Sequence, residues 1–355
     1  MSSRLTTRHK ELATGLGALT IAMVLWIAAS LTESERDSTV LEASTVNVGA
    51  QPVGEILAKQ PTENSRQAKA FPENAAGLRL PVPGSRFYGV EFNSLGFRGP
   101  EPENIAADKP HSLAADEPIR ILYLGNSVTL DIRSEGWPAL TTEKLAEVFP
   151  DCRFTHQNGG IPGVNTRGQR NYFLDMRARY KPDIVVLMTD DRKATSTLML
   201  KRLGRDHDQA TRLVLTRENT VSRYRTDLPQ LLGAIREHNA TPVLLSFGQW
   251  ARRNQSAGDL ARATRRYRAR EPYMTAQGFL DAADWYNEVN AEVAEKQGVT
   301  YIEWHRRVPG KARYFRDLKH FREAGSALMA KVLAQELRNS SLFSQILSSR
   351  FGCGG

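Results

Sequence analysis

The chain contains 355 residues, of which 41% are hydrophobic and 25% are charged, a composition that excludes a disordered or collagen-like protein and allows a sizeable core. With 48 basic and 39 acidic side chains, the formal net charge is +9, which permits contact with anionic polymers or lipid head groups without selecting a partner. The two cysteines, Cys152 and Cys353, are too few and too far apart in sequence to indicate a disulfide framework or a zinc cluster, and no histidine lies in an HExxH motif. We therefore expect no metal, and we expect both cysteines to be bystanders.

A strongly apolar segment lies near the N-terminus. Residues 13–31 carry no charged side chain and would form a helix about 28 Å long, close to the thickness of a bilayer core. Basic residues precede this segment and acidic residues follow it, namely Arg4, Arg8, Lys10, Glu33, Glu35 and Asp37. The positive-inside rule therefore predicts a single-pass signal anchor in the bacterial cytoplasmic (inner) membrane, with residues 1–12 in the cytoplasm and the C-terminal domain in the periplasm. A cleaved signal peptide ending near Ala28 and Ser30 is the alternative.

The segment between this apolar stretch and the main domain changes character twice. Residues 32–85 are rich in Ser, Thr, Glu, Asn, Ala and Pro and show weak periodicity, which predicts a stalk or linker with few contacts. The segment from Phe87 to Gly99 mixes aromatic and turn residues, so we expect a hairpin or bent strand on the edge of the domain. A polar loop then runs to Glu117.

From Pro118 onward, short apolar runs alternate with amphipathic segments of helical length, which predicts a parallel β-sheet with helices on both faces. Five strands are expected, at 119–124, 153–156, 183–188, 242–246 and 300–303. Helices are expected near 137–148, 166–180, 227–239, 283–297 and 322–337. With the preceding hairpin, these elements define a domain over residues 86–340, followed by a C-terminal tail, 341–355, whose pattern indicates no particular structure.

Two long insertions interrupt this alternation, from Arg192 to Arg225 and from Gly248 to Gly278. Loops of such length often cover or form binding sites. The second insertion contains a cluster of arginines, which are Arg252, Arg253, Arg262, Arg265, Arg266, Arg268 and Arg270. These cations either form a solvated helix face or contact an anionic glycan or membrane lipid, whereas nucleic acid is not an expected partner of an exported domain.

Residues that directly follow the strands are the candidates for chemistry, because ligands bind beyond the carboxyl ends of parallel strands. After the first strand, Gly125 permits a sharp turn and Ser127 lies where the next helix offers free amide hydrogens, a placement typical of a nucleophile and also of an ordinary helix cap. After the second strand, a glycine-rich turn runs from Asn158 to Thr166. Its glycine spacing does not match a dinucleotide cradle, and Gly163 fits better as an oxyanion donor.

A serine nucleophile needs a base and an acid that orients the base. Asp317 and His320 form a DxxH sequence in the loop before the last helix, where they either lie together above the sheet or form an ordinary helix start. His305, after the fifth strand, is a rival base, but Ile302 occupies the position three residues before it. His320 is therefore the preferred base.

Taken in order, these residues resemble the SGNH (GDSL-like) hydrolase family. The matching segments are LYLGNSVT, GWPALTTEKL, QNGGIPGVNT, KPDIVVLM and DLKHFREAGSALMAKVL, with the lead-in NSLGFRGPE. The resemblance implies a three-layer α/β/α, flavodoxin-like fold and a serine ester hydrolase without a metal or a diffusible cofactor. On the matching positions it implies that Ser127 is the nucleophile, His320 the general base and acid, and Asp317 the residue that orients His320. It also implies an oxyanion hole formed by the amides of Ser127 and Gly163.

Two positions depart from the family pattern. Asn126 stands where the family has Asp before the serine, a change that still allows a capped turn. In the third block the family has GxND, whose Asn donates to the oxyanion, whereas this chain reads MTDDR from Met188, with Arg192 at the Asn position. Either another side chain replaces this donor, or an ionised aspartate repels the oxyanion and suppresses hydrolysis. The residues concerned are Asp190, Asp191, Arg192 and Asn165.

These inferences predict a serine ester hydrolase or acyl (acetyl) transferase that acts outside the cytoplasmic membrane on O-acyl groups of a polysaccharide, with lipid esters and small acyl esters as open alternatives. Its expected partners are the acylated glycan or other ester and, through residues 13–31, the membrane; no nucleic acid is expected. The alternative is an SGNH scaffold with impaired catalysis that binds a glycan or serves in assembly. A nucleotide binder of flavodoxin-like topology is disfavoured because no fitting phosphate loop is present.

Overall fold

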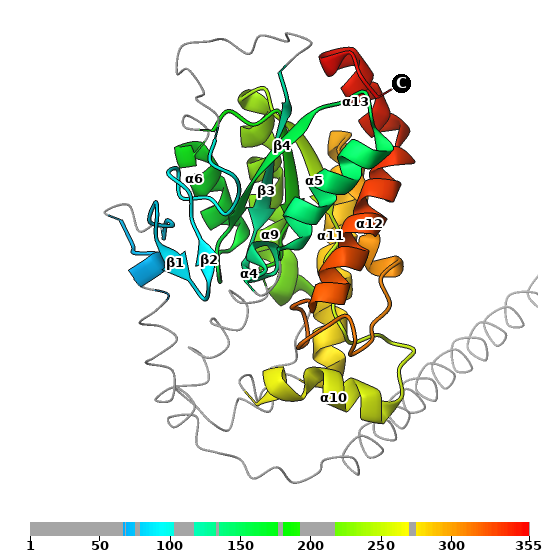
Figure 1. Cartoon of the computed structure of the whole chain (residues 1–355). Coiled ribbons are helices and arrows are strands. Elements are labelled where there is room, and N and C mark those ends of the chain that lie inside the picture. Colours follow the sequence, from blue (N-terminus) through cyan, green and yellow to red (C-terminus); the bar gives the residue numbers. More distant parts are fainter. Residues whose placement is uncertain are drawn as a thin grey trace, which may run out of the picture. The chain divides into compact units, whose positions relative to one another are not determined.

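The computed structural model describes residues 67, 69–74, 79–102, 117–132, 135–176, 180–191, 217–269 and 275–354 (Figure 1). The chain divides into two compact units, Met1–Gln60 and Pro61–Gly355, and all described residues belong to the second. The predicted membrane anchor, 13–31, lies outside the described residues. None of the described helices is long and apolar enough to cross a membrane.

A parallel sheet of five strands forms the centre of the domain. The strands are β3 (Ile119–Gly125), β4 (Phe154–Gly160), β5 (Ile184–Met188), β6 (Thr241–Leu245) and β7 (Thr300–Ile302). They lie in the order β4-β3-β5-β6-β7, and every neighbouring pair is parallel. The predicted α/β fold with a central five-stranded parallel sheet is confirmed.

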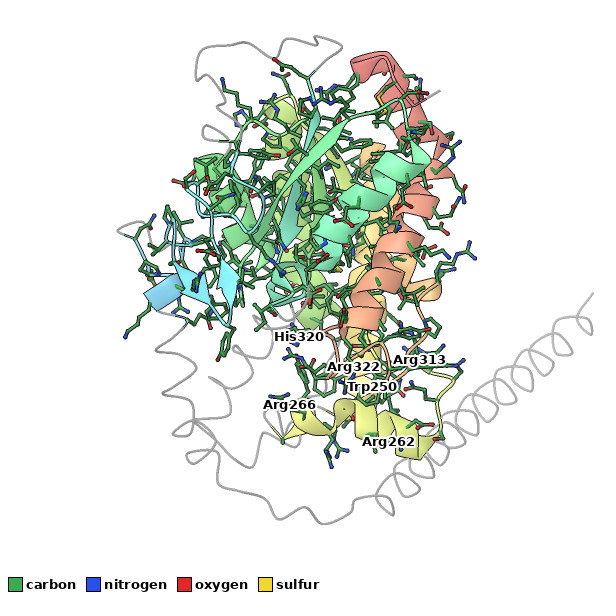
Figure 2. All side chains as sticks on the ribbon, viewed as in Figure 1. Trp250, Arg262, Arg266, Arg313, His320 and Arg322 are labelled. Atoms are coloured by element: carbon green, nitrogen blue, oxygen red, sulfur yellow. A yellow bond between two sulfur atoms is a disulfide. The ribbon has the colours of Figure 1, made fainter. Side chains whose placement is uncertain are left out.

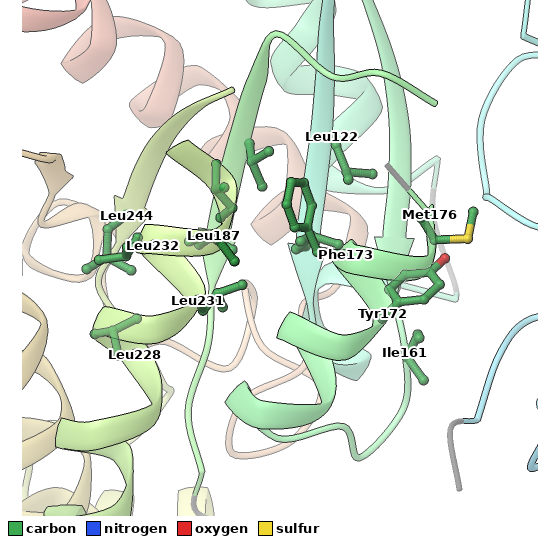
Figure 3. Close-up of a cluster of buried hydrophobic side chains, with 14 of the residues drawn as sticks. Leu122, Ile161, Tyr172, Phe173, Met176, Leu187, Leu228, Leu231, Leu232 and Leu244 are labelled. Carbon is green, nitrogen blue, oxygen red and sulfur yellow. The ribbon is translucent and has the colours of Figure 1, made fainter. Parts of the chain in front are cut away.

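Helices cover both faces of the sheet because successive strand residues point to opposite sides. Ile121 and Tyr123 of β3 belong to one buried cluster, and Leu122 and Leu124 belong to the other. The first cluster includes α5 (Trp137–Val148), α12 (Glu323–Arg338) and α13 (Ser341–Phe351). The second includes α6 (Thr166–Met176), α9 (Arg217–Glu237) and α11 (Ala276–Gln297), and Figure 3 shows part of it. The domain is therefore three layers deep, α/β/α.

The described helices differ from the predicted ones mainly in the second layer. Helix α9 begins at Arg217 rather than near Asp227, because Val221, Tyr224 and Leu228 recur at helical spacing and pack in the same cluster. Within the second predicted insertion lies α10 (Ala257–Arg268), and a 3₁₀ turn, η1 (Trp304–Arg306), follows β7.

Strand β4 is longer than predicted. Residues Asn158 to Gly160, interpreted from the sequence as part of a turn, instead pair with Tyr123 to Gly125 of β3. A Cβ atom on Gly160 would run into the backbone of Leu130, so the absence of a side chain allows the chain after β3 to pack on the end of β4. Gly159 and Gly160 therefore allow close packing within the strand, and the turn starts only at Ile161.

The segment before the sheet also packs more than expected. Phe71, inside the predicted stalk, is fully buried and its ring meets those of Phe87 and Phe92 edge to face, with centroids 5.1 and 5.3 Å apart. The hairpin expected within this region consists of two short antiparallel strands, β1 (Arg86–Phe87) and β2 (Val90–Glu91). Aromatic rings thus attach the last part of the lead-in to the domain, although its polar composition indicates a loose linker.

The C-terminal tail ends in a disulfide. Helix α13 buries Phe343 and Leu347 in the first cluster, and Cys353 then bonds to Cys152, whose Cα atom is 5.4 Å away. The prediction that the cysteines are bystanders is wrong, because the packing of α13 brings together two residues that are 201 positions apart. The pairing leaves no free cysteine in the chain.

Candidate active site

The sheet order places a topological switch point at the carboxyl ends of β3 and β5. The chain leaves β3 in one direction to form β4 and later returns on the other side to form β5, and this reversal is where ligands bind in flavodoxin-like sheets. A short helix, α4 (Ser127–Leu130), starts at this point. A Cβ atom on Gly125 would lie 2.6 Å from the carbonyl oxygen of Met188, so only glycine allows the chain to turn into α4 here.

Asn126 caps α4 and so places Ser127 in its first turn. The Asn126 side chain accepts a hydrogen bond from the amide of Val128 at 3.0 Å. The first amides of a helix have no carbonyl partner within the helix, so the Ser127 amide is oriented to bind a negatively charged oxygen. Ser127 itself is half-buried.

The loop before α12 carries the other two predicted residues. An isolated bridge between Phe315 and Phe321 closes this loop, and the Arg316 amide donates to the His320 carbonyl at 2.9 Å. Leu318 is buried, and its carbonyl accepts the Trp250 amide at 2.7 Å. These contacts fix Asp317 and His320 above the sheet edge.

The structure brings Ser127, His320 and Asp317 into one hydrogen-bonded line. The Nε2 atom of His320 lies 2.9 Å from Ser127 Oγ, and its Nδ1 atom lies 2.8 and 2.9 Å from the two carboxylate oxygens of Asp317. Because an ionised carboxylate only accepts, Nδ1 carries the proton, and Nε2 is left to accept from the serine hydroxyl. This tautomer is the one that a general base requires.

The charges of the pair suit this role. Burial raises the pKa of the Asp317 carboxyl, but the hydrogen bond and charge of His320 and the amides of His320 and Lys319 outweigh it, so the pKa lies well below its ordinary value. Burial lowers the pKa of His320 more than the hydrogen bond and charge of Asp317 raise it. His320 is therefore neutral and Asp317 ionised at neutral pH.

Gly163 lies in the turn after β4. The Ile161 amide at the start of this turn donates to the Gly125 carbonyl at 3.0 Å, which ties the turn to the residue two positions before Ser127. Gly163 is exposed and has φ +74°, a conformation that favours glycine. The turn at Gly163 is therefore open to solvent.

The sequence matches the GDSL-like Lipase/Acylhydrolase family over residues 123–328, which is more than half of the chain and includes Ser127, Asp317 and His320. The chain belongs to this family. No curated protein matches it. Among solved structures, the chain is similar to one described as a GDSL-like lipase from Parabacteroides merdae, at 16% identity over 62% of this chain and 95% of that chain, with a TM-score of 0.45. It is also similar to the acetylxylan esterase Axe2 from Geobacillus stearothermophilus, at 18% identity over 61% and 93% with a TM-score of 0.42. A third similar structure is the esterase EstA from a Pseudoalteromonas species, at 14% identity over 62% and 97% with a TM-score of 0.41.

The departure in the first block of the family pattern is coupled to the third block. Asn126 Nδ2 donates to Asp190 Oδ2 at 3.0 Å, and both side chains are buried. The register that aligns Gly125 with Met188 makes this contact possible. One N–H of the Asn126 side-chain amide is therefore occupied by Asp190.

Asp191, the second acid of the third block, faces the start of α6. Its Oδ1 atom accepts hydrogen bonds from both the amide and the hydroxyl of Thr166, each at 2.8 Å, while its Oδ2 atom is buried without a partner among the described residues. Burial raises the pKa of Asp191 to about 6, the two Thr166 hydrogen bonds lower it, and the nearby charges of Asp190 and Asp227 raise it further. Neither acid supplies an amide donor, and Arg192 lies outside the described residues.

Asn165 remains a candidate donor. Its Oδ1 atom accepts the Gly168 amide at 2.8 Å and so caps α6. Because Oδ1 makes that bond, Nδ2 is the part of the side chain that is left to donate. The residue lies two positions after Gly163, in the same turn, and is half-buried.

Arg98 supports the site, and no sequence pattern indicates this role. Its guanidinium donates to the carbonyls of Leu130 (2.7 Å) and Asp131 at the C-terminal end of α4, and its backbone pairs with Asn158 of β4. Burial lowers the pKa of this guanidinium, while Asp131 and Glu135 act in the opposite direction. Arg98 lies in the quoted NSLGFRGPE lead-in, but only the folded register shows that it holds α4.

His305, the rival base, makes other contacts. Its amide donates to Ser246 Oγ at 3.3 Å, and its carbonyl accepts from Arg252. Burial, with the charges of Arg252 and Arg306, lowers its pKa to about 4. Within the part of the chain that the structure describes, no group of three or more His, Cys, Asp or Glu side chains is placed to hold a metal ion.

Proposed function

We propose that this chain is a serine ester hydrolase or acyl transferase of the GDSL-like family, with Ser127 as nucleophile, His320 as base and Asp317 as the orienting acid. The observation that carries the proposal is the continuous hydrogen-bonded line from Ser127 Oγ through both ring nitrogens of His320 to Asp317. A half-buried serine hydroxyl at the start of a helix has no structural need for such an arrangement.

In the acylation step, Ser127 Oγ attacks the carbonyl carbon of the ester while His320 Nε2 takes the hydroxyl proton. Asp317 stabilises the imidazolium through the Nδ1 hydrogen bond. The tetrahedral intermediate then collapses, the bond to the alcohol oxygen breaks, and His320 gives its proton to the departing alcohol. The product is an acyl ester on Ser127.

In the second step, His320 takes a proton from an incoming hydroxyl, whose oxygen attacks the acyl carbon. Collapse of this intermediate returns the proton to Ser127 Oγ and releases the acyl group on its new acceptor. If the incoming molecule is water the reaction is hydrolysis, and if it is a hydroxyl of another molecule the reaction is acyl transfer. The same residues serve both outcomes.

In this proposal the oxyanion accepts hydrogen bonds from three donors, which are the amides of Ser127 and Gly163 and the side-chain Nδ2 of Asn165. The accessible turn of Gly163 and the cap geometry of Asn165 support this assignment. A donor of this kind is typically worth about a hundredfold to a thousandfold in rate. Asn165 would thereby replace the Asn that the third block lacks.

The proposed location is outside the cytoplasmic membrane, and the proposed substrate carries O-acyl groups on a polysaccharide. Two features support export. The apolar segment 13–31 with its flanking charges has the pattern of a signal anchor, and the Cys152–Cys353 disulfide is typical of an oxidising compartment. A polysaccharide with O-acyl groups is a polymer that a domain in this proposed location would reach.

Labelling with a fluorophosphonate probe tests the nucleophile. We expect full-length protein to be labelled, and we expect the Ser127→Ala and His320→Ala variants to lose labelling. Ser348→Ala, which removes an exposed serine of α13, is the matched control and should label normally. Labelling that persists in Ser127→Ala would contradict the assignment.

A binding module without catalysis is the second candidate, and the two buried carboxyls of the third block favour it because they supply no oxyanion donor. The same labelling experiment separates the two functions. A folded wild-type chain that is not labelled, and whose affinity for a glycan is unchanged by Ser127→Ala, would support the binding module.

A further inference from the structure

Helix α10 presents a row of arginines on the face opposite its buried side. Leu260, Ala263, Thr264 and Tyr267 follow helical spacing and form the packed side, with Ala263 and Thr264 fully buried. The remaining face carries exposed Arg262, Arg265, Arg266 and Arg268. The sequence alone does not decide whether this arginine cluster is only a solvated face.

The packed side of α10 rests on the catalytic loop. Leu318, which lies between Asp317 and His320, shares a buried cluster with Ala263 and Phe279, and Leu260 and Tyr267 pack against that cluster. Trp250, whose amide donates to the Leu318 carbonyl, also contacts it. Figure 2 shows Arg262, Arg266 and Trp250 at the same end of the domain as His320.

Acidic partners neutralise only some of these cations. Arg262 pairs with Asp259, and Arg253 pairs with Asp281 and Asp284. In contrast, Arg265, Arg266 and Arg268 make no ion pair or side-chain hydrogen bond with any residue that the structure describes.

Two further arginines extend this charge on the other side of the catalytic loop. Arg313 stacks on the ring of Tyr314, 4.6 Å from its centroid, and Arg322 donates to the carbonyls of Ala312 and Phe315. Neither has an acidic partner within the described ranges, and both are exposed. Figure 2 places both at the His320 end of the domain. We call Arg265, Arg266, Arg268, Arg313 and Arg322 the basic rim.

We propose that the basic rim binds the carboxylate groups of an acidic polysaccharide, so that an O-acyl group on a neighbouring sugar reaches Ser127. This inference rests on the proposed function and names its substrate class as an acylated, carboxylate-bearing glycan. Guanidinium groups bind carboxylates through paired hydrogen bonds, and several of them along one edge match the repeated charge of such a polymer.

The surface chemistry favours a glycan over a membrane. A helix that lies on a bilayer inserts apolar side chains from the face that meets the lipid. Here the large apolar residues of α10 are turned into the protein, and the exposed large hydrophobic residues of the described chain, Tyr88 and Leu342, belong to other elements. The exposed face of α10 is therefore suited to a hydrated polyanion.

Binding of full-length Ser127→Ala protein to polygalacturonate tests the proposal without turnover. We expect Arg265→Gln/Arg266→Gln/Arg268→Gln to weaken this binding about tenfold, with most of the difference lost at high salt. The matched control removes three lysines elsewhere in the domain, Lys144→Gln/Lys181→Gln/Lys331→Gln, and should change the affinity less than about twofold, although the loss of net charge is equal. Neutral xylan should bind more weakly than polygalacturonate to the parent protein.

Equal weakening by the two triple variants would overturn the proposal, because net charge alone would then explain the binding. Binding to phosphatidylglycerol vesicles with none to polygalacturonate would also overturn it, in favour of a lipid surface.

Hydrolysis of p-nitrophenyl acetate by the chain with Ser127 intact separates this inference from the proposed function. The α10 variant should hydrolyse this small ester at the parent rate, which also shows that it folds. Absence of esterase activity in both, with rim-dependent binding retained, would refute the enzyme and leave the basic rim.

Discussion

Two groups of polar side chains share the carboxyl edge of this sheet and differ in how their atoms are satisfied. In the first group, Ser127, His320 and Asp317, each side chain has its hydrogen-bond partner and its protonation state suits proton transfer. In the second group, Asp190 and Asp191, one buried oxygen of Asp191 has no partner among the residues that the structure describes, and burial favours the neutral form of that carboxyl. The proposed proton path is complete among the described residues, whereas neither acid of the third block supplies an oxyanion donor, so the proposed oxyanion hole depends on the turn that carries Gly163 and Asn165.

The largest effect should come from breaking the first group. Asp317→Asn keeps the size of the side chain but favours the wrong tautomer of His320, so kcat on p-nitrophenyl acetate should fall about a thousandfold to ten-thousandfold. Steady-state kinetics measure this. A loss of less than about tenfold would show that Asp317 does not orient the base.

The proposed replacement donor gives the next effect. Asn165→Ser retains an oxygen that can cap α6 but removes Nδ2, so kcat should fall about a hundredfold with little change in KM. Asn165→Asp keeps the cap and adds a negative charge beside the proposed oxyanion, so this variant should lower kcat further. An unchanged kcat in the serine variant would leave the two backbone amides as the whole oxyanion hole.

The donor and the acceptor of the Asn126–Asp190 hydrogen bond can be exchanged. Asn126→Asp keeps the cap of α4 but sets one carboxylate against Asp190, so activity should fall about tenfold or more. The double variant Asn126→Asp/Asp190→Asn restores a donor and an acceptor in exchanged positions and should recover most of that loss. A double variant no better than the single one would show that the pair does not act through this hydrogen bond.

The buried charge of Asp191 can be removed by substitution with asparagine. Because the pKa of Asp191 is raised from 3.8 to about 6, the cost of burying its charge is absent only below about pH 3, grows between about pH 4 and pH 6, and is constant above about pH 7. Asp191→Asn should therefore raise the free energy of unfolding by about 3 kcal/mol at pH 7.5 and by less than about 1 kcal/mol at pH 4. Denaturant unfolding at both pH values measures this, and equal effects at the two would contradict it.

The smallest expected effect is a shift in a pH profile. His320 acts only when neutral, and its pKa is lowered by burial, so the acid limb of kcat/KM should lie below pH 6.5, the ordinary value for histidine. A limb at or above that value would show that the charge of Asp317 outweighs burial.

The sequence was sufficient for features that depend on local patterns. Apolar runs bounded by prolines predict β5 and β6 nearly to the residue, and the order of Ser127, Gly163 and the DxxH sequence predicts the polar line at the sheet edge. Features that depend on the register between strands could not be predicted from the sequence. The Asn126–Asp190 contact requires Gly125 to align with Met188, and the role of Arg98 requires its pairing with β4. Local composition even misleads at Gly159 and Gly160, which indicate a turn but lie in a strand.

The Cys152–Cys353 bond turns most of the domain into a covalent ring. Strands β4 to β7 and the loop with Asp317 and His320 lie inside this ring, whereas β3 and Ser127 precede it. The strand that carries the nucleophile is thus held between two strands of the ring, β4 and β5. A single proteolytic cut anywhere between the two cysteines would leave one covalent molecule, so the base and the nucleophile stay tethered even after the backbone between them is broken.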